Sequence, residues 1–465
     1  MSTEYFDLCV LGAGTAGYNA AVQARELGHS VALVDGRGDL AGLCILRGCM
    51  PAKTVLHAID VAHEAAVASA LGVDAAVHVD AKVLVARKRH LVDEFKEDRL
   101  DGIAQFPLFR GEPRFVDAHR LAVDGTTIEA QRFVIATGST IEAPPITGLT
   151  ASDYFTSDVA LELTRIPKRI VTIGGGPVGC EFAQYFARLG SEVTIVQETP
   201  TLLRSEDDDV GQAVRGALER DGVRVMCDAR ITSIDRRDDE RIVSIESQGD
   251  RETIVVDAVF LATGRRPNVE DFDFERAGIA FDRTGIRVDE YLRTTSPHIF
   301  AAGDVIGRRC LVHAAEHGGK IAAKNAFCDA PVAMDFDLFD THSVYVQPEV
   351  AVTGLTERVA RSRNIEIEVA SYQFSEHGKA LTMNLPDGFV KVVAARADGT
   401  ILGVTFVGEG AVDLIHEAST LLYYHAKVSD VLNMPHLHPT MGEIITYPCE
   451  EISKRLSLQR EIVYY

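Results

Sequence analysis

Two cysteines five positions apart are the residues with the most evident chemistry in this sequence. Cys44 and Cys49 stand in the run 42–53, shortly after a glycine-rich turn of the kind that binds dinucleotides. This arrangement is typical of a redox-active disulfide that exchanges an electron pair with a bound cofactor. A disulfide in a chain that shows no export signal is usually catalytic rather than structural.

The same pair of cysteines is also compatible with two buried free thiols or with half of a metal site. Metal-binding cysteines usually have two to four residues between them and need two further ligands. The neighbouring sequence offers no such ligands, so we expect no metal.

The spacing also constrains the backbone around the cysteines. In an ideal helix, residues five apart have Cα atoms about 8.7 Å apart, whereas a disulfide needs less than about 7 Å. We therefore predict a distorted segment, which Gly48 makes easier. A helix N-terminus nearby, or Lys53, would lower a thiol pKa in this segment.

A histidine near the other end of the chain has the chemistry to accept a thiol proton. His438 precedes Glu443 by five positions. A carboxylate can orient an imidazole ring and raise its basicity, so that the histidine acts as a general base. By itself such a pair is also compatible with a structural histidine or a weak metal pair.

The elements that must position these residues follow one pattern that occurs twice. In the first copy, a strand over 6–11 leads into Gly12, Gly14 and Gly17, a helix over 18–27 and a strand over 30–34 that ends at Asp35. In the second copy, a strand over 169–173 leads into Gly174, Gly176 and Gly179, a helix over 180–189 and a strand over 192–196. Glycines let the backbone approach a pyrophosphate, and the helix N-terminus supplies oriented N–H groups. Two related runs, 133–138 and 259–264, support a duplication.

The position of the cysteines assigns the two nucleotide sites. A flavin must touch the disulfide, so the first site should hold FAD, with Asp35 accepting hydrogen bonds from the ribose, and the second should hold the nicotinamide. The second strand is followed by Gln197 and Glu198; an acid favours NAD and arginines favour NADP. We expect NAD, and Arg204 leaves NADP open.

A further run, 301–304, follows a strand-like 299–300 and ends in Asp304. This carboxylate could accept hydrogen bonds from the ribityl hydroxyls of a flavin. A helix that opens near Val312 would direct its N-terminus at the ring and stabilise negative charge there.

Length and charge limit the function classes. The chain has 465 residues and a formal net charge of −21, which argues against nucleic-acid and anionic-membrane partners. We see no targeting or membrane-spanning segment and expect a cytoplasmic protein. Six of the eight cysteines are scattered singly and are expected to be reduced thiols.

These motifs together resemble the FAD-containing pyridine nucleotide–disulfide oxidoreductases over essentially the whole chain. The match includes Ala136–Gly138 and Ala262–Gly264 as well as the residues above, and within the family it is most like the dihydrolipoyl dehydrogenases. The resemblance implies an α/β fold with two Rossmann-like dinucleotide-binding domains and a C-terminal α+β interface (dimerisation) domain. We expect FAD-binding segments at 1–145 and 269–338, an NAD(P)-binding domain at 146–268 and an interface domain at 339–465.

The resemblance also implies residue roles. Cys44 would be the interchange thiol, Cys49 the charge-transfer thiol, and His438 the acid/base held by Glu443. Lys53 would lie near the flavin N5 and pair with Glu181 on the nicotinamide side. The remaining cofactor-binding positions would be Pro113 at the adenine, with Thr137, Gly138, Gln197 and Gly264. The dyad of one subunit would reach the disulfide of the other, which implies a homodimer.

The implied reaction is ping-pong oxidation of dihydrolipoamide on a lipoyl carrier protein or domain, by NAD through FAD. Departures from the usual motif, namely Leu43, Leu46, Arg47, Ala52 and Pro177, put the substrate in doubt more than the chemistry. One alternative is an NADPH-dependent reductase of another low-molecular-weight disulfide, which Arg47 and Arg204 favour. Another is a scaffold flavoprotein, which the intact cysteines and dyad oppose. A mercuric reductase is disfavoured because residues 460–465 hold no cysteine pair.

Overall fold

A computed structural model describes residues 2–458, and the chain forms two compact units, each built from three segments. The first contains residues 2–54, 86–142 and 264–336. The second contains residues 55–85, 143–263 and 337–458. Residues 460–465, on which the argument against a mercuric reductase rests, lie outside the described residues.

The first unit is built on a seven-stranded sheet in the order β3-β2-β1-β6-β5-β4, with β19 paired to β6. Its strands are β1 (Ser2–Leu11), β2 (Val31–Asp35), β3 (Leu108–Arg110), β4 (Pro113–Asp117), β5 (Arg120–Val123), β6 (Thr126–Ile135) and β19 (Ile299–Ala301). Strands β3, β2, β1, β6 and β19 pair in parallel, and β4, β5 and β6 pair antiparallel. The last four residues of β1 are fully buried, as expected for a central parallel strand.

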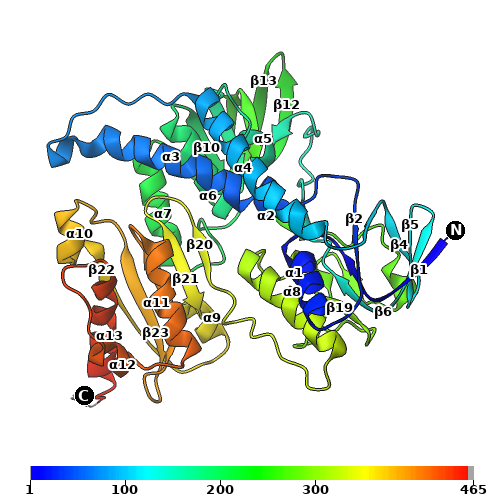
Figure 1. The fold of residues 1–465 in the computed structure, drawn as a ribbon. Coiled ribbons are helices and arrows are strands. Elements are labelled where there is room, and N and C mark those ends of the chain that lie inside the picture. Colours follow the sequence, from blue (N-terminus) through cyan, green and yellow to red (C-terminus); the bar gives the residue numbers. More distant parts are fainter. Residues whose placement is uncertain (1, 459–465) are drawn as a thin grey trace. The chain divides into compact units, whose positions relative to one another are not determined.

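Two helices of this unit, α1 (Thr15–Glu26) and α8 (Val312–Phe327), lie side by side (Figure 1). The contact needs a glycine, because a Cβ at Gly319 would lie 2.1 Å from the carbonyl oxygen of Ala16. The unit also contains the small sheets of β7 (Ser139–Ile141) with β16 (Arg265–Pro267) and of β17 (Phe281–Asp282) with β18 (Gly285–Ile286).

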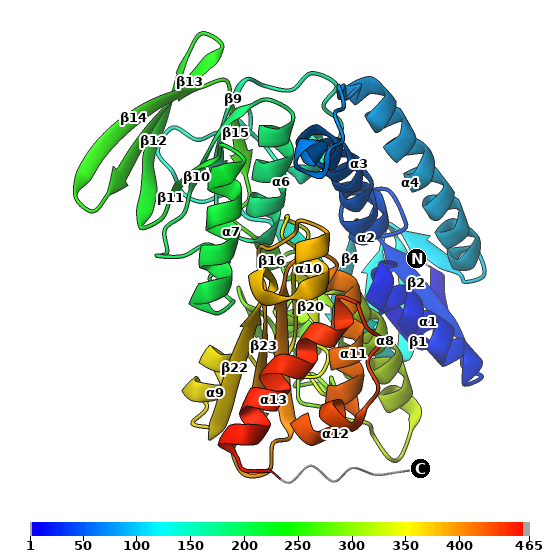
Figure 2. The same ribbon diagram turned by 90° about the vertical axis from the view of Figure 1, so that its left-hand side faces the viewer.

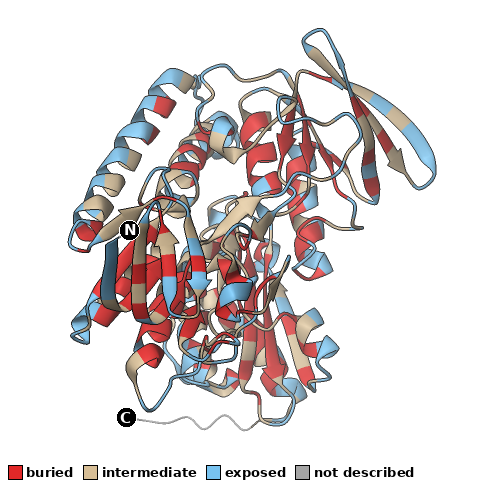
Figure 3. Cartoon of the chain, turned by 90° about the vertical axis from the view of Figure 1, so that its right-hand side faces the viewer, coloured by how far each residue is buried: buried red, intermediate tan, exposed pale blue. Residues whose placement is uncertain are grey.

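Three further helices belong wholly or partly to the first unit. They are α2 (Leu43–Leu46), α3 (Cys49–Val67) and α4 (Ala81–Ile103). Buried residues concentrate in the strands, whereas most of α4 is exposed or half-buried (Figure 3).

The second unit contains a parallel sheet that carries the second glycine turn. Its order is β11-β10-β9-β15-β8, with helices α6 and α7 beside it (Figure 2). The bounds are β8 (Tyr154–Phe155), β9 (Arg169–Ile173), β10 (Glu192–Val196), β11 (Arg224–Met226), β15 (Ala258–Leu261), α5 (Ser157–Ala160), α6 (Pro177–Arg188) and α7 (Asp208–Arg220). An antiparallel sheet follows, made of β12 (Ala229–Arg237), β13 (Glu240–Ser247) and β14 (Asp250–Val256).

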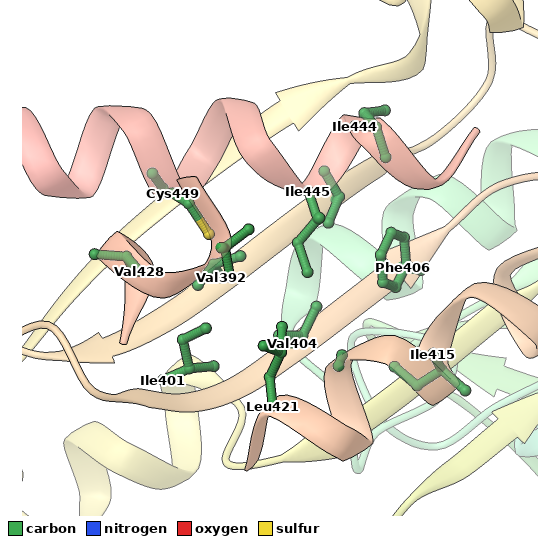
Figure 4. Packing of buried hydrophobic residues seen from close by; sticks show 14 of the residues in the cluster. Val392, Ile401, Val404, Phe406, Ile415, Leu421, Val428, Ile444, Ile445 and Cys449 are labelled. Carbon is green, nitrogen blue, oxygen red and sulfur yellow. The ribbon is translucent and has the colours of Figure 1, made fainter. Parts of the chain in front are cut away.

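The C-terminal part of this unit is an antiparallel sheet in the order β20-β21-β24-β23-β22. Its elements are β20 (His342–Val344), β21 (Val350–Gly354), β22 (Ile367–Gln373), β23 (Phe389–Ala395), β24 (Ile401–Val407), α9 (Glu357–Ser362), α10 (Gly378–Thr382), α11 (Ala411–Tyr423), α12 (Val428–Asn433) and α13 (Thr446–Arg455). Val392, Val404 and Phe406 of the sheet share one buried core with Ile415 of α11 and Cys449 of α13 (Figure 4).

This architecture confirms the predicted fold class, and it shifts several element ends. The last helix is preceded by a 3₁₀ turn at Gly442–Ile445, which leads directly into α13. Both nucleotide-site helices begin earlier than predicted, at Thr15 and Pro177, because the last residues of each glycine turn already belong to the first helical turn.

Glu349 gives the second unit a pH-dependent stability. Burial raises the pKa of this carboxyl to about 7, and Glu409, Asp413 and Asp60 add repulsion, while an N–H from Val412 acts in the opposite direction. Since the folded pKa lies above the unfolded one, stability is highest below the unfolded pKa and is lost as the pH rises through about 7.

We therefore expect Glu349→Gln to stabilise the unit at pH 8 by about 1–3 kcal/mol, and to give less than about 1 kcal/mol at pH 5. Thermal unfolding midpoints at both pH values measure the effect, with the exposed Glu112→Gln as control. An equal gain at both pH values would contradict the assignment.

Candidate active site

The first glycine turn is shaped by backbone groups that touch one another. Gly12 has φ +102°, and a Cβ there would lie 2.2 Å from the carbonyl oxygen of Ala136. A Cβ at Gly17 would lie 1.7 Å from the carbonyl oxygen of Gly12. At Gly14 the nearest atom to a Cβ is the Cα of Gly42, 3.8 Å away. The packing of the protein therefore demands the first and third glycines, but not the second.

The second turn repeats this arrangement. A Cβ at Gly174 (φ +103°) would lie 2.5 Å from the carbonyl oxygen of Ala262, and one at Gly179 would lie 2.0 Å from that of Gly174. A Cβ at Gly176 would meet no atom within 4 Å.

A side chain at the end of the next strand closes each turn with a hydrogen bond; Asp35 is the last residue of β2, and Gln197 directly follows β10. The N–H of Ala13 donates to Oδ2 of Asp35 over 2.6 Å, and the N–H of Gly175 donates to Oε1 of Gln197 over 2.7 Å. Burial raises the pKa of Asp35, against the lowering effect of the Ala13 N–H. The amide of Gln197 makes the same contact without a charge.

Both turns fit the pyrophosphate of a dinucleotide. Gly14 and Gly176 are the N-cap residues of α1 and α6, and neither helix has a side-chain cap. The first N–H groups of each helix therefore point toward the space beside the N-cap glycine, which no side chain fills. This is the arrangement that helix N-termini offer to phosphate groups.

The segment after β6 is tied to the end of β16 in the first unit. The Thr137 hydroxyl donates to the carbonyl oxygen of Asn268 over 2.8 Å, and the N–H of Asn268 donates to that of Gly138 over 2.9 Å. The Ser139 hydroxyl donates to Asp304 Oδ2 over 2.6 Å. Arg265 donates to both the hydroxyl and the carbonyl oxygen of Ser139. Arg265 therefore fixes the serine that donates to Asp304. The sequence patterns did not indicate these partners.

Three other predicted positions of this unit lie in defined places. Pro113 begins β4, Val312 begins α8 after Leu311 as N-cap, and Gly264 precedes β16 with φ +109°.

The two cysteines lie on either side of a helix break, as the spacing predicted. Cys44 belongs to α2, which ends before Arg47 (φ −147°), and Cys49 begins α3. A Cβ at Gly48 would lie 3.0 Å from the carbonyl oxygen of Leu43, so the break favours glycine. Both thiols are reduced in this structure.

The pKa of Cys44 is raised, in contrast to the expected lowering of a thiol pKa in this segment. The largest cause is its hydrogen bond with the Cys49 thiol, followed by burial, while the N–H groups of Cys49 and Met50 at the start of α3 act in the opposite direction. The helix N-terminus thus contributes as expected, but two adjacent thiols cannot both ionise easily.

His438 and Glu443 form the predicted dyad in the second unit. Nδ1 of His438 lies 3.1 Å and 3.0 Å from the two carboxylate oxygens. The histidine side chain is 80% exposed and the glutamate side chain 13% exposed. The carboxylate engages Nδ1, so Nε2 is the ring nitrogen that this contact leaves available to another group.

Glu181 is buried in α6 and accepts the N–H of Tyr345 over 2.9 Å. One turn further, Gln184 accepts the N–H of Gln347 over 2.8 Å and donates to its carbonyl oxygen over 2.9 Å. Lys53 belongs to the first unit and Glu181 to the second, and their pairing stays a prediction.

Comparison with known proteins agrees with this geometry. A family model described as pyridine nucleotide-disulphide oxidoreductase matches residues 6–319, and the dimerisation domain of the same family matches residues 341–448. The chain belongs to this family. The members of the family are enzymes that depend on FAD and NAD(P), which the two glycine turns fit.

Individual relatives differ in what they act on. A dihydrolipoyl dehydrogenase of Thermus scotoductus is 36% identical over 97% of this chain and 98% of its own length. A mercuric reductase of Lysinibacillus sphaericus is 32% identical over 95% of this chain and 82% of its own length. The HOCl-induced flavoprotein disulfide reductase RclA of Escherichia coli, solved as a Cu(II) complex, has a TM-score of 0.84 and 26% identity over 96% of this chain and 99% of its own.

Membrane-spanning and metal-binding features are absent from residues 2–458. No helix there combines the length and the apolar character needed to cross a membrane. No group of three or more His, Cys, Asp or Glu side chains there could hold a metal ion.

The contrast between Gly174 and Gly176 is testable. Because a Cβ at Gly176 meets no protein atom within 4 Å, Gly176→Ala should keep the thermal midpoint but weaken nicotinamide dinucleotide binding at least about tenfold. Gly174→Ala, with its contact at 2.5 Å and positive φ, should lower the midpoint itself. Calorimetry and dinucleotide titration separate the two effects. Unchanged binding in folded Gly176→Ala would contradict a pyrophosphate site at this turn.

Proposed function

We propose that this enzyme is a dihydrolipoyl dehydrogenase, which oxidises dihydrolipoamide on a lipoyl carrier protein or domain with NAD. The observation that carries the proposal is the dithiol at the break between α2 and α3, where Cys44 and Cys49 share a hydrogen bond at the start of a helix. The identity to dihydrolipoyl dehydrogenases over nearly the full chain supports it.

In the oxidised enzyme these cysteines form a disulfide. One substrate thiolate attacks the Cys44 sulfur, so that a mixed disulfide forms and the bond to Cys49 breaks. The second substrate thiol then attacks the substrate sulfur of the mixed disulfide, which releases the cyclic disulfide and leaves the dithiol. Each step is thiolate exchange, whose rate depends on the thiolate fraction and on access to the sulfur. A bound FAD would supply the transfer of the electron pair between the dithiol and the nicotinamide.

His438 supplies the thiolate by accepting a substrate proton at Nε2, while Glu443 stabilises the resulting imidazolium from Nδ1. The exposure of this histidine, together with the family dimerisation domain, supports a homodimer in which the dyad serves the disulfide of the other subunit. The predicted domain bounds remain part of this proposal.

The cofactor positions are proposed from the same pattern. FAD uses the turn at Gly12, Gly14 and Gly17, and NAD the turn at Gly174, Gly176 and Gly179. The acid position of the second turn holds Gln197, and the exposed Glu198 next to it favours NAD.

A reductase of another low-molecular-weight disulfide is the second candidate. Arg47 stands between the two cysteines, where it adds positive charge to the dithiol segment, and the exposed Arg204 lies near the nicotinamide turn. Relatives named mercuric reductase and flavoprotein disulfide reductase also support a wider substrate range.

Steady-state assays of the purified enzyme separate the candidates. We expect oxidation of dihydrolipoamide with NAD to exceed reduction of other disulfides with NADPH by at least about tenfold in kcat/KM. The opposite preference in kcat/KM would favour the second candidate function.

Cys49→Ser should abolish the long-wavelength absorbance of the two-electron-reduced enzyme, and Cys44→Ser should keep it. Absorbance retained in Cys49→Ser would contradict the role of Cys49 as the charge-transfer thiol.

His438→Ala should slow dithiol oxidation at least about 100-fold. Transfer from NADH to an artificial acceptor should change little, because that half-reaction needs no thiol proton. The exposed His90→Ala is the matched control. Equal losses in both reactions would show that the ring is not the base.

A further inference from the structure

A second histidine lies next to Glu443, on the opposite side of the dyad from solvent. His377 is the N-cap residue of α10, and its Nε2 lies 3.6 Å from Oε1 of Glu443. The same oxygen lies 3.1 Å from Nδ1 of His438. The carboxylate therefore stands between two imidazole rings, one exposed and one buried.

His377 is buried. The residue is 1% exposed, and neither ring nitrogen has a hydrogen-bond partner among residues 2–458. The ring of Tyr447 packs edge-on against that of His377, with ring centroids 6.0 Å apart. The ring of Tyr372 stacks on that of Tyr447, with centroids 4.1 Å apart. A buried polar nitrogen without a partner is costly, and Oε1 of Glu443 lies 3.6 Å from Nε2.

The environment of His377 favours the neutral form of its ring. Burial lowers the pKa of His377 below its ordinary value, His438 acts in the same direction, and Glu443 acts against both. A neutral imidazole carries one N–H donor, so it can donate to a carboxylate without adding a second positive charge beside His438.

We propose that His377 is a positioning residue for the dyad and that its ring donates an N–H from Nε2 to Oε1 of Glu443 during thiol oxidation. The inference rests on the proposed function, because it assigns His438 as the base. The 3.6 Å separation closes to hydrogen-bond length with a small shift of either side chain. The donated bond keeps the carboxylate facing Nδ1 and withdraws part of its negative charge from the exposed ring.

Loss of this bond has two consequences. The carboxylate gains freedom to turn, which lowers kcat for dithiol oxidation. Its charge also acts more strongly on His438, so that the base stays protonated up to a higher pH. Tyr447 packs edge-on against His377 and Glu376 precedes it in the chain, and both residues are kept in the variants below.

The test compares His377→Phe with His377→Asn in the dimeric, FAD-loaded enzyme. We expect His377→Phe to lower kcat for dithiol oxidation about tenfold, the worth of one buried hydrogen bond, with little change in KM. The acidic limb of the pH–rate profile should move to higher pH. His377→Asn keeps a donor and should restore most of the rate and the original limb.

A matched control and a double variant exclude a merely structural effect. His342 is another histidine that faces a carboxylate; its side chain is 7% exposed, and its Nε2 lies 3.0 Å from Glu206. His342→Phe should leave the acidic limb in place even if stability falls. In a Glu443→Gln background, His377→Phe should add less than about a twofold further loss, since both act through one carboxylate.

The outcomes also separate this inference from the proposed function. An enzyme that does not oxidise dihydrolipoamide contradicts the proposed substrate, and the variants are then compared on the disulfide that it does reduce. An active enzyme in which His377→Phe keeps its rate and pH profile overturns the role of His377. Additive losses with Glu443→Gln overturn it as well.

Discussion

The close approach of backbone to backbone at the two glycine turns is the constraint on which the active site depends. At Gly17 and Gly179 the Cα rests against the carbonyl oxygen of the first glycine of its own turn, at distances that exclude any side chain. This contact draws the start of α1 and α6 down onto the sheet and directs their first N–H groups toward the ends of the strands. The middle glycines, which the protein packing does not need, keep the same place open for a phosphate.

The two turns also show how one geometry accepts different chemistry. Asp35 and Gln197 accept the same backbone N–H within their turns, so the loop requires an acceptor at the strand end and not a charge. A carboxylate in this place keeps a second oxygen for a ribose hydroxyl, whereas an amide presents a neutral group. The choice between them therefore affects the nucleotide more than the fold.

The geometry and the ionisation of the cysteine pair have different causes, one local and one that depends on packing. The break between α2 and α3 is local, since Gly48 and the extended φ of Arg47 turn the chain between the cysteines. The ionisation of Cys44 is decided by its neighbour and by burial, which outweigh the helix N-terminus. The dyad follows the same division: a separation of five residues brings His438 to Glu443, whereas His377 reaches that carboxylate from a different part of the chain.

Local sequence patterns were enough to predict the two glycine turns, the strand–helix–strand order around them, the broken helix at the cysteines and the pairing of His438 with Glu443. These features arise from residues close together in the chain, where rise per residue and glycine freedom dictate the geometry. Tertiary structure alone decided the support of Asp304 by Ser139 and Arg265, the docking of Glu181 and Gln184 on 345–347, and the burial of His377 behind Glu443. Each of these contacts joins segments far apart in sequence, and no periodicity or spacing encodes which distant segment a side chain will meet.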